Sequence, residues 1–130
     1  MAEKLTLGKK ERLKSRKLIE QLFSEGNKFG IPPFRIFYLY KGEKKASLQF
    51  GVGVSSRNFK KAIERNRIKR LIREAYRLQK LALQNKLKEK NGEMNLFVIY
   101  TGKEMPSYAE VYAQMNKVLD KLYNIINPLV

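Results

Sequence analysis

The sequence predicts one α+β domain, with helices packed on a single mixed sheet. At 130 residues, 43% of them hydrophobic, the chain can bury one modest core and is too short for two. Residues 48–54 (LQFGVGV) alternate apolar and small or polar side chains, as a half-buried strand does. Residues 57–77 and 107–128 repeat apolar residues at helical spacing. We therefore expect the order α-β-β-β-α-β-α within one domain, residues 1–130.

The N-terminal region predicts an arm followed by a short helix. Residues 1–14 are polar and basic, and Gly8 interrupts them, so we expect a flexible or extended arm that contacts phosphate or is simply solvated. Ser15 can cap a helix that runs to about Ser24 and ends at Gly26. The apolar side of this helix is Leu18, Ile19, Leu22 and Phe23.

Two strands are clear next, and the third strand of the expected order falls between residues 31 and 40. Residues 30–33 contain Gly and two Pro and predict a loop, and residues 34–40 (FRIFYLY) predict an aromatic-rich strand. Residues 41–45 (KGEKK) predict a polar hairpin turn before the alternating strand. In that strand Gly51 and Gly53 leave one face almost bare. Another group is therefore expected to lie close against this face of the strand, such as a packed helix or an extended nucleic-acid strand.

The long helix within 57–77 is densely positive. No Pro or Gly interrupts RNFKKAIERNRIKRLIREAYR, and Ser56 or Asn58 can cap its start. Nine Lys or Arg face two Glu, which leaves a net charge of +7. The cations are Arg57, Lys60, Lys61, Arg65, Arg67, Lys69, Arg70, Arg73 and Arg77.

Helical geometry, at about 100° per residue, sorts this segment into two faces. The packing face holds Ile68, Leu71, Ile72, Ala75, Leu78, Gln79 and Ala82. The adjoining cationic face holds Arg65, Asn66, Lys69, Arg70, Arg73, Arg77 and Lys80, with Arg67 at the border. Like charges at i, i+4 cost a few tenths of a kcal/mol per pair, and a bound polyanion would reverse that cost. The alternative interpretation is a solubilising surface.

The C-terminal part predicts a loop, a strand and a helix. Residues 84–95 lose periodicity, so we expect a solvated loop or frayed helix end with a turn at 91–92. Residues 95–100 (NLFVIY) predict a central strand. Ser107 and Glu110 form a capping box for a last helix that packs on the sheet. Its apolar stripe is Val111, Met115, Val118, Leu122 and Ile125.

The amino-acid composition restricts both the binding partner of the chain and the reactions that it could catalyse. With 28 Lys or Arg against 12 Asp or Glu, the formal charge is +16, and nucleic acid is the commonest partner that neutralises such a charge. The chain contains no Cys and no His, which excludes thiol nucleophiles, imidazole bases and zinc sites built on these residues. Glu64 and Glu74 lie among cations and form no acidic cluster for two-metal hydrolysis. We therefore predict no catalytic and no metal-binding residue.

Apolar stretches are short throughout the sequence. None approaches the ~20 residues of a membrane span, and the N-terminus lacks the apolar core of a signal peptide. We therefore expect a cytoplasmic protein without membrane association.

The segment ERNRIKRLIREAYR, residues 64–77, resembles the signature of the protein subunit of bacterial ribonuclease P. In that family an Arg-Asn-Arg triplet opens a run of the form RNxxKRxxRE. The matching residues here are Arg65, Asn66, Lys69, Arg70, Arg73 and Glu74. The resemblance extends from about Leu13 to Ile126. It implies a ribosomal protein S5 domain 2-like fold with a left-handed βαβ crossover, whereas the general rule favours the right hand.

The resemblance also implies roles for particular residues. In the family, a catalytic RNA cleaves the 5′ leader from precursor tRNA with Mg²⁺ that it holds itself, and the protein assists. We expect the protein to be a monomer without RNA. The residues expected to bind the RNA subunit are Arg65, Asn66, Arg67, Lys69, Arg70 and Arg73. The residues expected to bind the leader, in a cleft between the first helix and the sheet, are Ile19, Phe23, Phe37, Arg57, Lys60, Lys61 and Lys103.

Within the leader set, Phe23 and Phe37 are the stacking candidates and Ile19 is an apolar wall. On hydrophobicity alone Phe23 is expected in the core more than in a binding site, and Phe37 fits either. The family often has Phe at the position of Ile19, and Lys or Arg at that of Ser56. Two other function classes remain open: a ribosomal or RNA-chaperone protein without a cleavage role, and a nuclease that acts without RNA.

Overall fold

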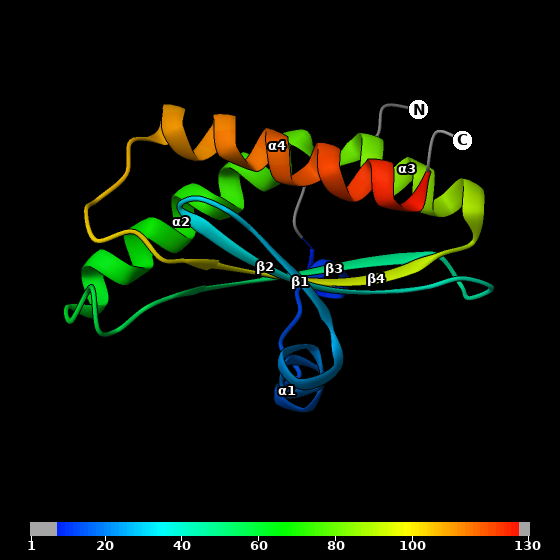
Figure 1. The fold of residues 1–130 in the computed structure, drawn as a ribbon, viewed down its shortest axis with the longest axis horizontal. Coiled ribbons are helices and arrows are strands. Elements are labelled where there is room, and N and C mark those ends of the chain that lie inside the picture. Colours follow the sequence, from blue (N-terminus) through cyan, green and yellow to red (C-terminus); the bar gives the residue numbers. More distant parts are fainter. Residues whose placement is uncertain (1–7, 128–130) are drawn as a thin grey trace.

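The structure, a computed structural model, describes residues 8–127 and confirms the predicted α+β class (Figure 1). A short 3-10 helix precedes four α-helices and four strands in this part of the chain. In chain order the elements are η1 (Lys9–Glu11), α1 (Arg16–Glu25), β1 (Asn27–Ile31), β2 (Phe34–Lys41), β3 (Ser47–Val54), α2 (Ala62–Gln79), α3 (Leu81–Lys90), β4 (Glu93–Tyr100) and α4 (Tyr108–Ile126).

The strands form one mixed sheet in the order β1-β2-β4-β3. β1 and β2 are antiparallel, β2 and β4 are antiparallel, and β3 and β4 are parallel. β4 is central, as its apolar sequence predicts, because side chains on both of its faces are covered. The predicted hairpin at 41–45 is wrong, because β4 lies between β2 and β3 and the connection crosses the end of β4.

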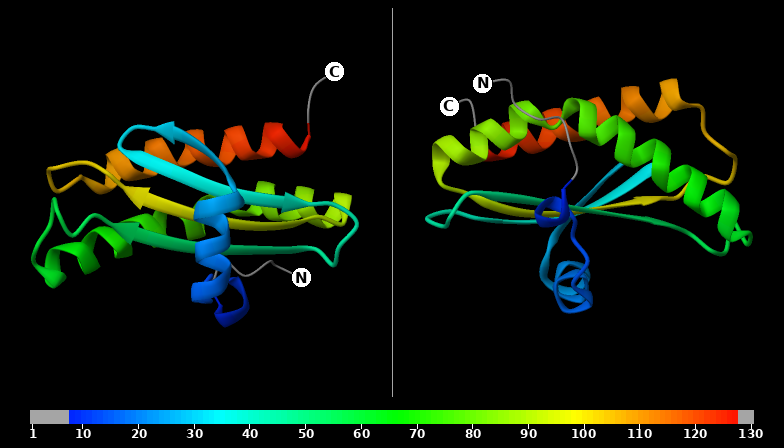
Figure 2. Two further views of the ribbon diagram at one scale, coloured as in Figure 1. Left: turned by 60° about the horizontal axis from the view of Figure 1, so that its bottom comes forward. Right: turned by 180° about the vertical axis from the view of Figure 1, so that it is seen from behind.

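The sheet separates a thick layer from a thin one. Helices α2, α3 and α4 cover one face, and α1 crosses the strands on the other (Figures 1 and 2). Alternation along β4 directs Met94, Leu96 and Val98 into the core below the three helices. It directs Phe97 and Ile99 toward α1. The two faces of one strand thus serve two separate apolar clusters.

β3 and β4 are adjacent and parallel, and the chain between them forms α2 and α3 on one face of the sheet (Figure 1). The βαβ crossover that the resemblance implies is therefore present. Its left-handed sense stays a prediction.

Local signals set α1 and α4 as predicted. The Ser15 hydroxyl oxygen accepts from the Leu18 N–H, and α1 ends at Gly26. The Ser107 hydroxyl oxygen accepts from the Glu110 N–H at the start of α4. The predicted stripe of α4 is correct except for its end, where Ile126 is buried and Ile125 is 38% exposed.

The start of α2 differs from the prediction. The helix begins at Ala62, and its N-cap Lys61 provides no side-chain cap, so neither Ser56 nor Asn58 caps it. Phe59 is buried and turns the chain before the helix. Asn58 instead ties this loop to the segment after β4, because its Nδ2 donates to the carbonyl oxygens of residues 101 and 102.

Two regular elements overlap the segments predicted as a loop (30–33) and as a loop or frayed helix end (84–95). Residues 27–31 pair with β2 as the edge strand β1. Residues 81–90 form α3, whose Leu83 and Leu87 are buried. Two apolar anchors are too few to show helical periodicity in the sequence. The predicted turn is present, because Asn91 adopts a left-handed conformation with φ 50° and ends α3.

Of the arm predicted at 1–14, residues 1–7 lie outside the part of the chain that the structure describes. Residues 8–14 lie against the sheet, where Leu13 is 5% exposed. The Leu13 N–H donates to the Phe50 carbonyl oxygen at 2.9 Å, and Arg12 forms an isolated bridge with the same residue. This N-terminal segment (residues 8–14) therefore covers part of the outer edge of β3.

Candidate nucleic-acid interface

The cationic face of α2 points away from the rest of the helical layer. Ile68, Ile72 and Ala75 are fully buried against the sheet. On a second side α4 contacts α2, where Gln79 Nε2 donates to the Tyr112 carbonyl oxygen at 3.0 Å. The side left open lies beyond the β3 edge, and the predicted cations occupy it.

One aromatic residue fixes this orientation and was not predicted to be buried. Tyr76 is fully buried, and its ring stacks on Phe50 of β3 with centroids 3.8 Å apart and planes 4° apart. Burial raises the pKa of Tyr76 well above its ordinary value, and the charge of Glu11 raises it further. The stack fixes α2 against β3 and so sets the direction in which its polar side points.

The six residues predicted to bind the RNA subunit lie together on α2. Asn66, Arg67, Arg70 and Arg73 are exposed, and Arg65 and Lys69 are half-buried. Among residues 8–127 the salt bridges involve other cations and none of these six: they are Arg77–Glu74, Lys80–Glu11 and Lys86–Glu89. The six therefore present a field of one sign to solvent.

Arg65 differs from the others because it also supports the backbone. Its Nη1 donates to the carbonyl oxygens of Phe59 and Lys60, both at 2.8 Å. These bonds brace the turn before α2. Arg65 thus holds the loop that carries Lys60 and Lys61, and only part of its guanidinium faces outward.

On the α1 side of the sheet, the apolar leader residues come together with one residue that was not predicted. Phe23 is 43% exposed, and its ring meets Phe37 edge-on at 4.9 Å and Phe97 at 5.3 Å. Phe37 is only 8% exposed, which favours the core interpretation for this residue. Ile19 is half-buried on α1 beside them. The outward ring of the predicted pair is therefore that of Phe23.

The four cations of the leader set lie at another end of the sheet. Arg57, Lys60 and Lys61 belong to the β3–α2 loop, and Lys103 belongs to the loop after β4. Both loops leave the carboxyl ends of the parallel strands, and the Asn58 hydrogen bonds join them. Three residues of β4 separate Phe97 from the end of the strand, which is about 10 Å. The strand alone therefore puts at least about 10 Å between the aromatic and cationic halves of this set.

A groove of about 340 Å³ opens where the N-terminal segment, α1 and the β3 edge meet. We call it the β3-edge groove. Its lining is Arg12, Leu13, Lys14, Ile19, Phe50, Gly51, Val52, Arg73 and Phe97. Partial burial lowers the pKa of Arg73, and the nearby charge of Arg12 lowers it further. Two like charges are therefore held close together beside an aromatic ring.

A buried ion pair holds the N-terminal segment in this position. Lys80, predicted on the cationic face, is fully buried between α2 and α3, and its Nζ donates to the carboxylate of Glu11. Gln84 Nε2 donates to the same carboxylate at 3.1 Å, and the Gly8 N–H donates to it at 3.0 Å. Burial alone would raise the pKa of Glu11, but these bonds outweigh it and lower that pKa.

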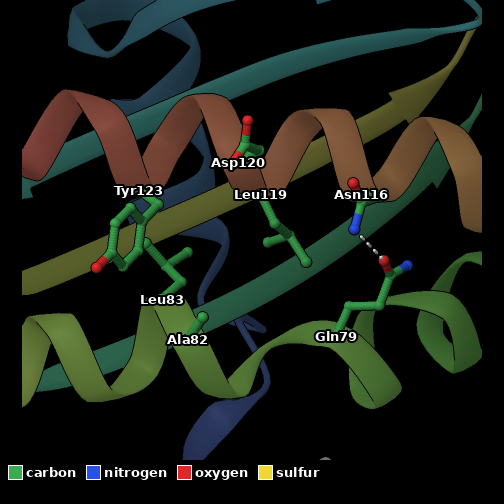
Figure 3. Close-up of a pocket in the computed structure, with 7 residues that line it drawn as sticks. All are labelled: Gln79, Ala82, Leu83, Asn116, Leu119, Asp120 and Tyr123. Carbon is green, nitrogen blue, oxygen red and sulfur yellow. Dashed lines mark hydrogen bonds between the residues drawn. The ribbon is translucent and has the colours of Figure 1, made fainter.

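The helical face carries a hollow of a different kind, of about 210 Å³ (Figure 3). Figure 3 shows Asn116 of α4 turned toward Gln79, to whose Oε1 it donates at 3.0 Å. Leu119, Asp120 and Tyr123 of α4 also line this hollow. It contains a carboxylate and no Lys or Arg, so it does not suit a phosphate group.

Neither a membrane-spanning helix nor a cluster of metal ligands occurs in the described part of the chain. No helix within residues 8–127 is long and apolar enough to cross a membrane. In the same range, no group of three or more His, Cys, Asp or Glu is placed to hold a metal ion.

Comparison with known proteins places these surfaces in context. Residues 7–123 match the sequence family described as Ribonuclease P. A "Ribonuclease P protein component" from Porphyromonas gingivalis is 36% identical over 117 residues, covering 89% of this chain and 85% of that protein. One of the same name from Chlorobium phaeobacteroides is 30% identical over 128 residues, covering 90% and 88%.

Solved structures show the same fold. A Staphylococcus aureus RNase P protein matches with a TM-score of 0.68 at 20% identity, over 85% of this chain and 94% of that one. A mutant of that protein, described as defective in mRNA degradation activity, matches with a TM-score of 0.65 at 19% identity, over 85% and 86%.

Proposed function

This chain belongs to the ribonuclease P protein family. From that premise we propose which RNA each of its two surfaces binds. Membership makes it the RNA-binding protein component of ribonuclease P, which associates with the RNA subunit of that enzyme. The alternative of a ribosomal or RNA-chaperone protein is not favoured. The proposal assigns the cationic face of α2 to the RNA subunit and the α1 side of the sheet to the leader of precursor tRNA.

The α2 face suits a folded RNA because it offers closely spaced donors in a rigid frame. Arg67, Arg70 and Arg73 supply forked guanidinium groups that match phosphate oxygens. Arg65 and Lys69 lie beside them, and Asn66 can read a base or sugar edge. Because no carboxylate in residues 8–127 pairs with these cations, RNA phosphates would be their first strong counter-charges.

The α1 side suits a single strand. Such strands bind where exposed rings stack on bases and cations follow the backbone. Phe23 offers the exposed ring, Ile19 an apolar wall and Phe37 the buried support beneath Phe23. The backbone of the leader would then pass the cations of the two loops, Arg57, Lys60, Lys61 and Lys103.

The remaining assignments follow from this division. The RNA subunit would hold the Mg²⁺ and cleave the phosphodiester, giving tRNA with a 5′ phosphate. The protein would lower the repulsion between two polyanions and so reduce the Mg²⁺ that their association requires. We further propose that the protein is a cytoplasmic monomer in the absence of RNA.

One observation carries the proposal: six residues of one helix lie on its open side, and none of them is bridged to a carboxylate in residues 8–127. The test is cleavage of precursor tRNA by a transcribed ribonuclease P RNA at low Mg²⁺, with and without the protein. We expect the protein to raise the cleavage rate and to lower the Mg²⁺ required. Unchanged cleavage would overturn the proposal.

A reaction with protein alone separates this role from that of a nuclease. The S. aureus mutant is described by its defect in mRNA degradation, an activity that belongs to that protein. Here Glu64 and Glu74 lie among the cations of α2, and no acidic cluster accompanies them in the described residues. We therefore expect no Mg²⁺-dependent cleavage by the protein without the RNA subunit.

A further inference from the structure

The N-terminal segment contacts both of the regions that the proposed function assigns to RNA. Its Glu11 is bound to the end of α2, because the buried Lys80 donates to the Glu11 carboxylate. Its Leu13 is buried in the apolar cluster on the α1 side of the sheet. One residue separates Glu11 from Leu13, so a single short stretch of backbone is fixed to both regions.

This segment lies over the end of the cationic row of α2. Lys69, Arg73 and Lys80 fall within about 40° of one another around the helix axis at 100° per residue. Lys69 and Arg73 belong to the set expected to bind the RNA subunit, whereas Lys80 is covered and paired with Glu11. Arg73 also lines the β3-edge groove beside Arg12. Arg73 therefore lies on the α2 face and next to the N-terminal segment at the same time.

A second series of contacts joins α2 to the same segment. The ring of Tyr76 stacks on Phe50, with centroids 3.8 Å apart. The Phe50 carbonyl oxygen accepts from the Leu13 N–H at 2.9 Å. All three residues are buried, and closely packed side chains transmit a displacement to their neighbours. Movement of the segment would therefore break contacts that lead back to α2.

Opposite electrostatic forces act on neighbouring residues of the segment. Glu11 is attracted to Lys80. Arg12 is repelled by Arg73: partial burial lowers the pKa of Arg73, and the charge of Arg12 lowers it further. The position of the segment in the structure is therefore less stable than the ion pair alone would make it.

We propose that Glu11 and Lys80 are positioning residues that couple the two RNA surfaces, so that an RNA-subunit phosphate on α2 strengthens leader binding and the leader strengthens binding of the RNA subunit. This proposal rests on the proposed function, because it requires both surfaces to bind RNA. It adds that binding at one surface changes the affinity of the other.

The coupling acts through Arg73. A phosphate bound there would neutralise the charge that repels Arg12, and so would favour the position that the segment has in the structure. In that position Leu13 packs in the same cluster as Phe37, which supports the leader residue Phe23. Ordering this support in advance removes a cost that leader binding would otherwise include. By linkage, the leader must favour binding of the RNA subunit by the same factor.

The test measures the affinity of the full-length protein for a transcribed ribonuclease P RNA by filter binding, with and without a saturating short oligouridylate in place of the leader. For the wild type we expect the oligouridylate to tighten binding by about fivefold, which is typical of coupled sites. Glu11→Gln keeps the size of the side chain and removes its charge, so this ratio should fall to about one. Glu11→Asp keeps the charge and should restore a ratio above that of Glu11→Gln.

The ratio distinguishes positioning from a purely structural role. If Glu11 only stabilised the fold, Glu11→Gln would weaken binding by the same factor with and without the oligouridylate, and the ratio would not change. Glu89→Gln is the matched control, because it removes the carboxylate of the Lys86–Glu89 ion pair, whose two residues both belong to α3. Its ratio should equal that of the wild type.

A second variant tests the repulsion at an exposed residue, and decides the question if Glu11→Gln does not fold. Arg12→Gln removes the charge beside Arg73. The ratio should again fall toward one, because a phosphate on Arg73 then relieves no repulsion. Lys117→Gln removes an equal charge from an exposed position on α4 and should keep the wild-type ratio.

Two results would overturn the inference: a wild-type ratio of one, or a wild-type ratio retained by Arg12→Gln or by folded Glu11→Gln. Failure here is distinct from failure of the proposed function. If the protein raises cleavage by the RNA subunit but shows no coupling, the proposed function stands and the two surfaces act independently. If the protein does not raise cleavage, the proposed function fails and this inference fails with it.

Discussion

The cationic face of α2 and the α1 side of the sheet are built in opposite ways. The α2 face comes from one continuous helix, so one period of the sequence places its cations side by side. The α1 side draws on the N-terminal segment, α1 and three strands, and β4 separates its two halves by at least about 10 Å. A surface made by one element can be read from sequence. A surface assembled from distant segments depends on long-range contacts, which no local sequence pattern indicates.

The two regions also differ in how much their side chains contribute to the stability of the fold. Cations of the α2 face such as Arg67 and Arg70 point to solvent. The α1 side rests on a small cluster with three buried members, Leu13, Leu22 and Phe37. We therefore expect changes at the exposed cations of the α2 face to affect RNA binding alone, whereas Arg65 also braces the turn before the helix. Changes around the α1 side should also affect stability.

The largest expected effect follows from removing Lys80. Lys80→Ala would leave the partly buried carboxylate of Glu11 without its ion pair, at a cost of about 2–4 kcal/mol in the free energy of unfolding. Urea denaturation measures this loss. Lys86→Ala is the matched control, because its partner Glu89 is exposed, and its loss should be much smaller. Equal losses for both variants would show that the N-terminal segment is not anchored by this pair.

The next effect concerns the α2 face. Arg67→Gln with Arg70→Gln should weaken binding to the RNA subunit by about 30-fold, or about 2 kcal/mol, because two charge-assisted contacts are lost. Filter binding across a salt series measures both affinity and slope. Thermal unfolding should be unchanged, since the same pair has no salt-bridge partner to lose among residues 8–127. An unaltered salt slope would remove this face from the interface.

A smaller effect is expected at Phe23. Phe23→Ala should lower affinity for precursor tRNA with a leader by about fivefold, because a base-stacking ring is lost. Binding of leaderless tRNA to the reconstituted enzyme is the control and should not change. If both substrates lose affinity equally, Phe23 acts through the fold and not through the leader.

The smallest effect is a pH dependence. The folded state lowers the pKa of Glu11 below its ordinary value of 4.5, so this carboxylate stabilises the fold above about pH 4.5. The contribution is lost as pH falls through the lower, folded value. The difference in unfolding free energy between wild type and Glu11→Gln should therefore shrink in acid. A difference that stays constant from neutral pH into acid would contradict the assignment.

Sequence reasoning succeeded where the signals were local. The strand at 48–54, the Ser107 N-cap of the last helix and the cationic row of α2 were all predicted correctly, since each depends on a few neighbouring residues. The bare glycine face of β3 correctly indicated a close approach. The approaching group is the Phe97 ring together with the Leu13 carbonyl oxygen, and not a helix.

The errors were long-range. Lys80 shares the helical angle of the solvent-facing cations, and its burial depends on Glu11, 69 residues away. Residues 8–14 are held by the same pair and by the edge of β3, neither of which a local sequence pattern indicates. Phe97 alternates with buried residues on β4, so nothing in its own neighbourhood distinguishes a cleft residue from a core residue. In each case the deciding partner lies in another element.

Crosslinking most directly tests the assignment of the α2 face to the RNA subunit and of the α1 side to the leader of precursor tRNA. The chain contains no Cys, so a single Cys placed at position 70 or at position 23 can carry a photoreactive benzophenone. In the reconstituted enzyme with bound precursor tRNA, we predict that the probe replacing Arg70 crosslinks to the RNA subunit and that the probe replacing Phe23 crosslinks to the leader. Both probes reaching the same RNA, or an exchange of targets, would contradict the account.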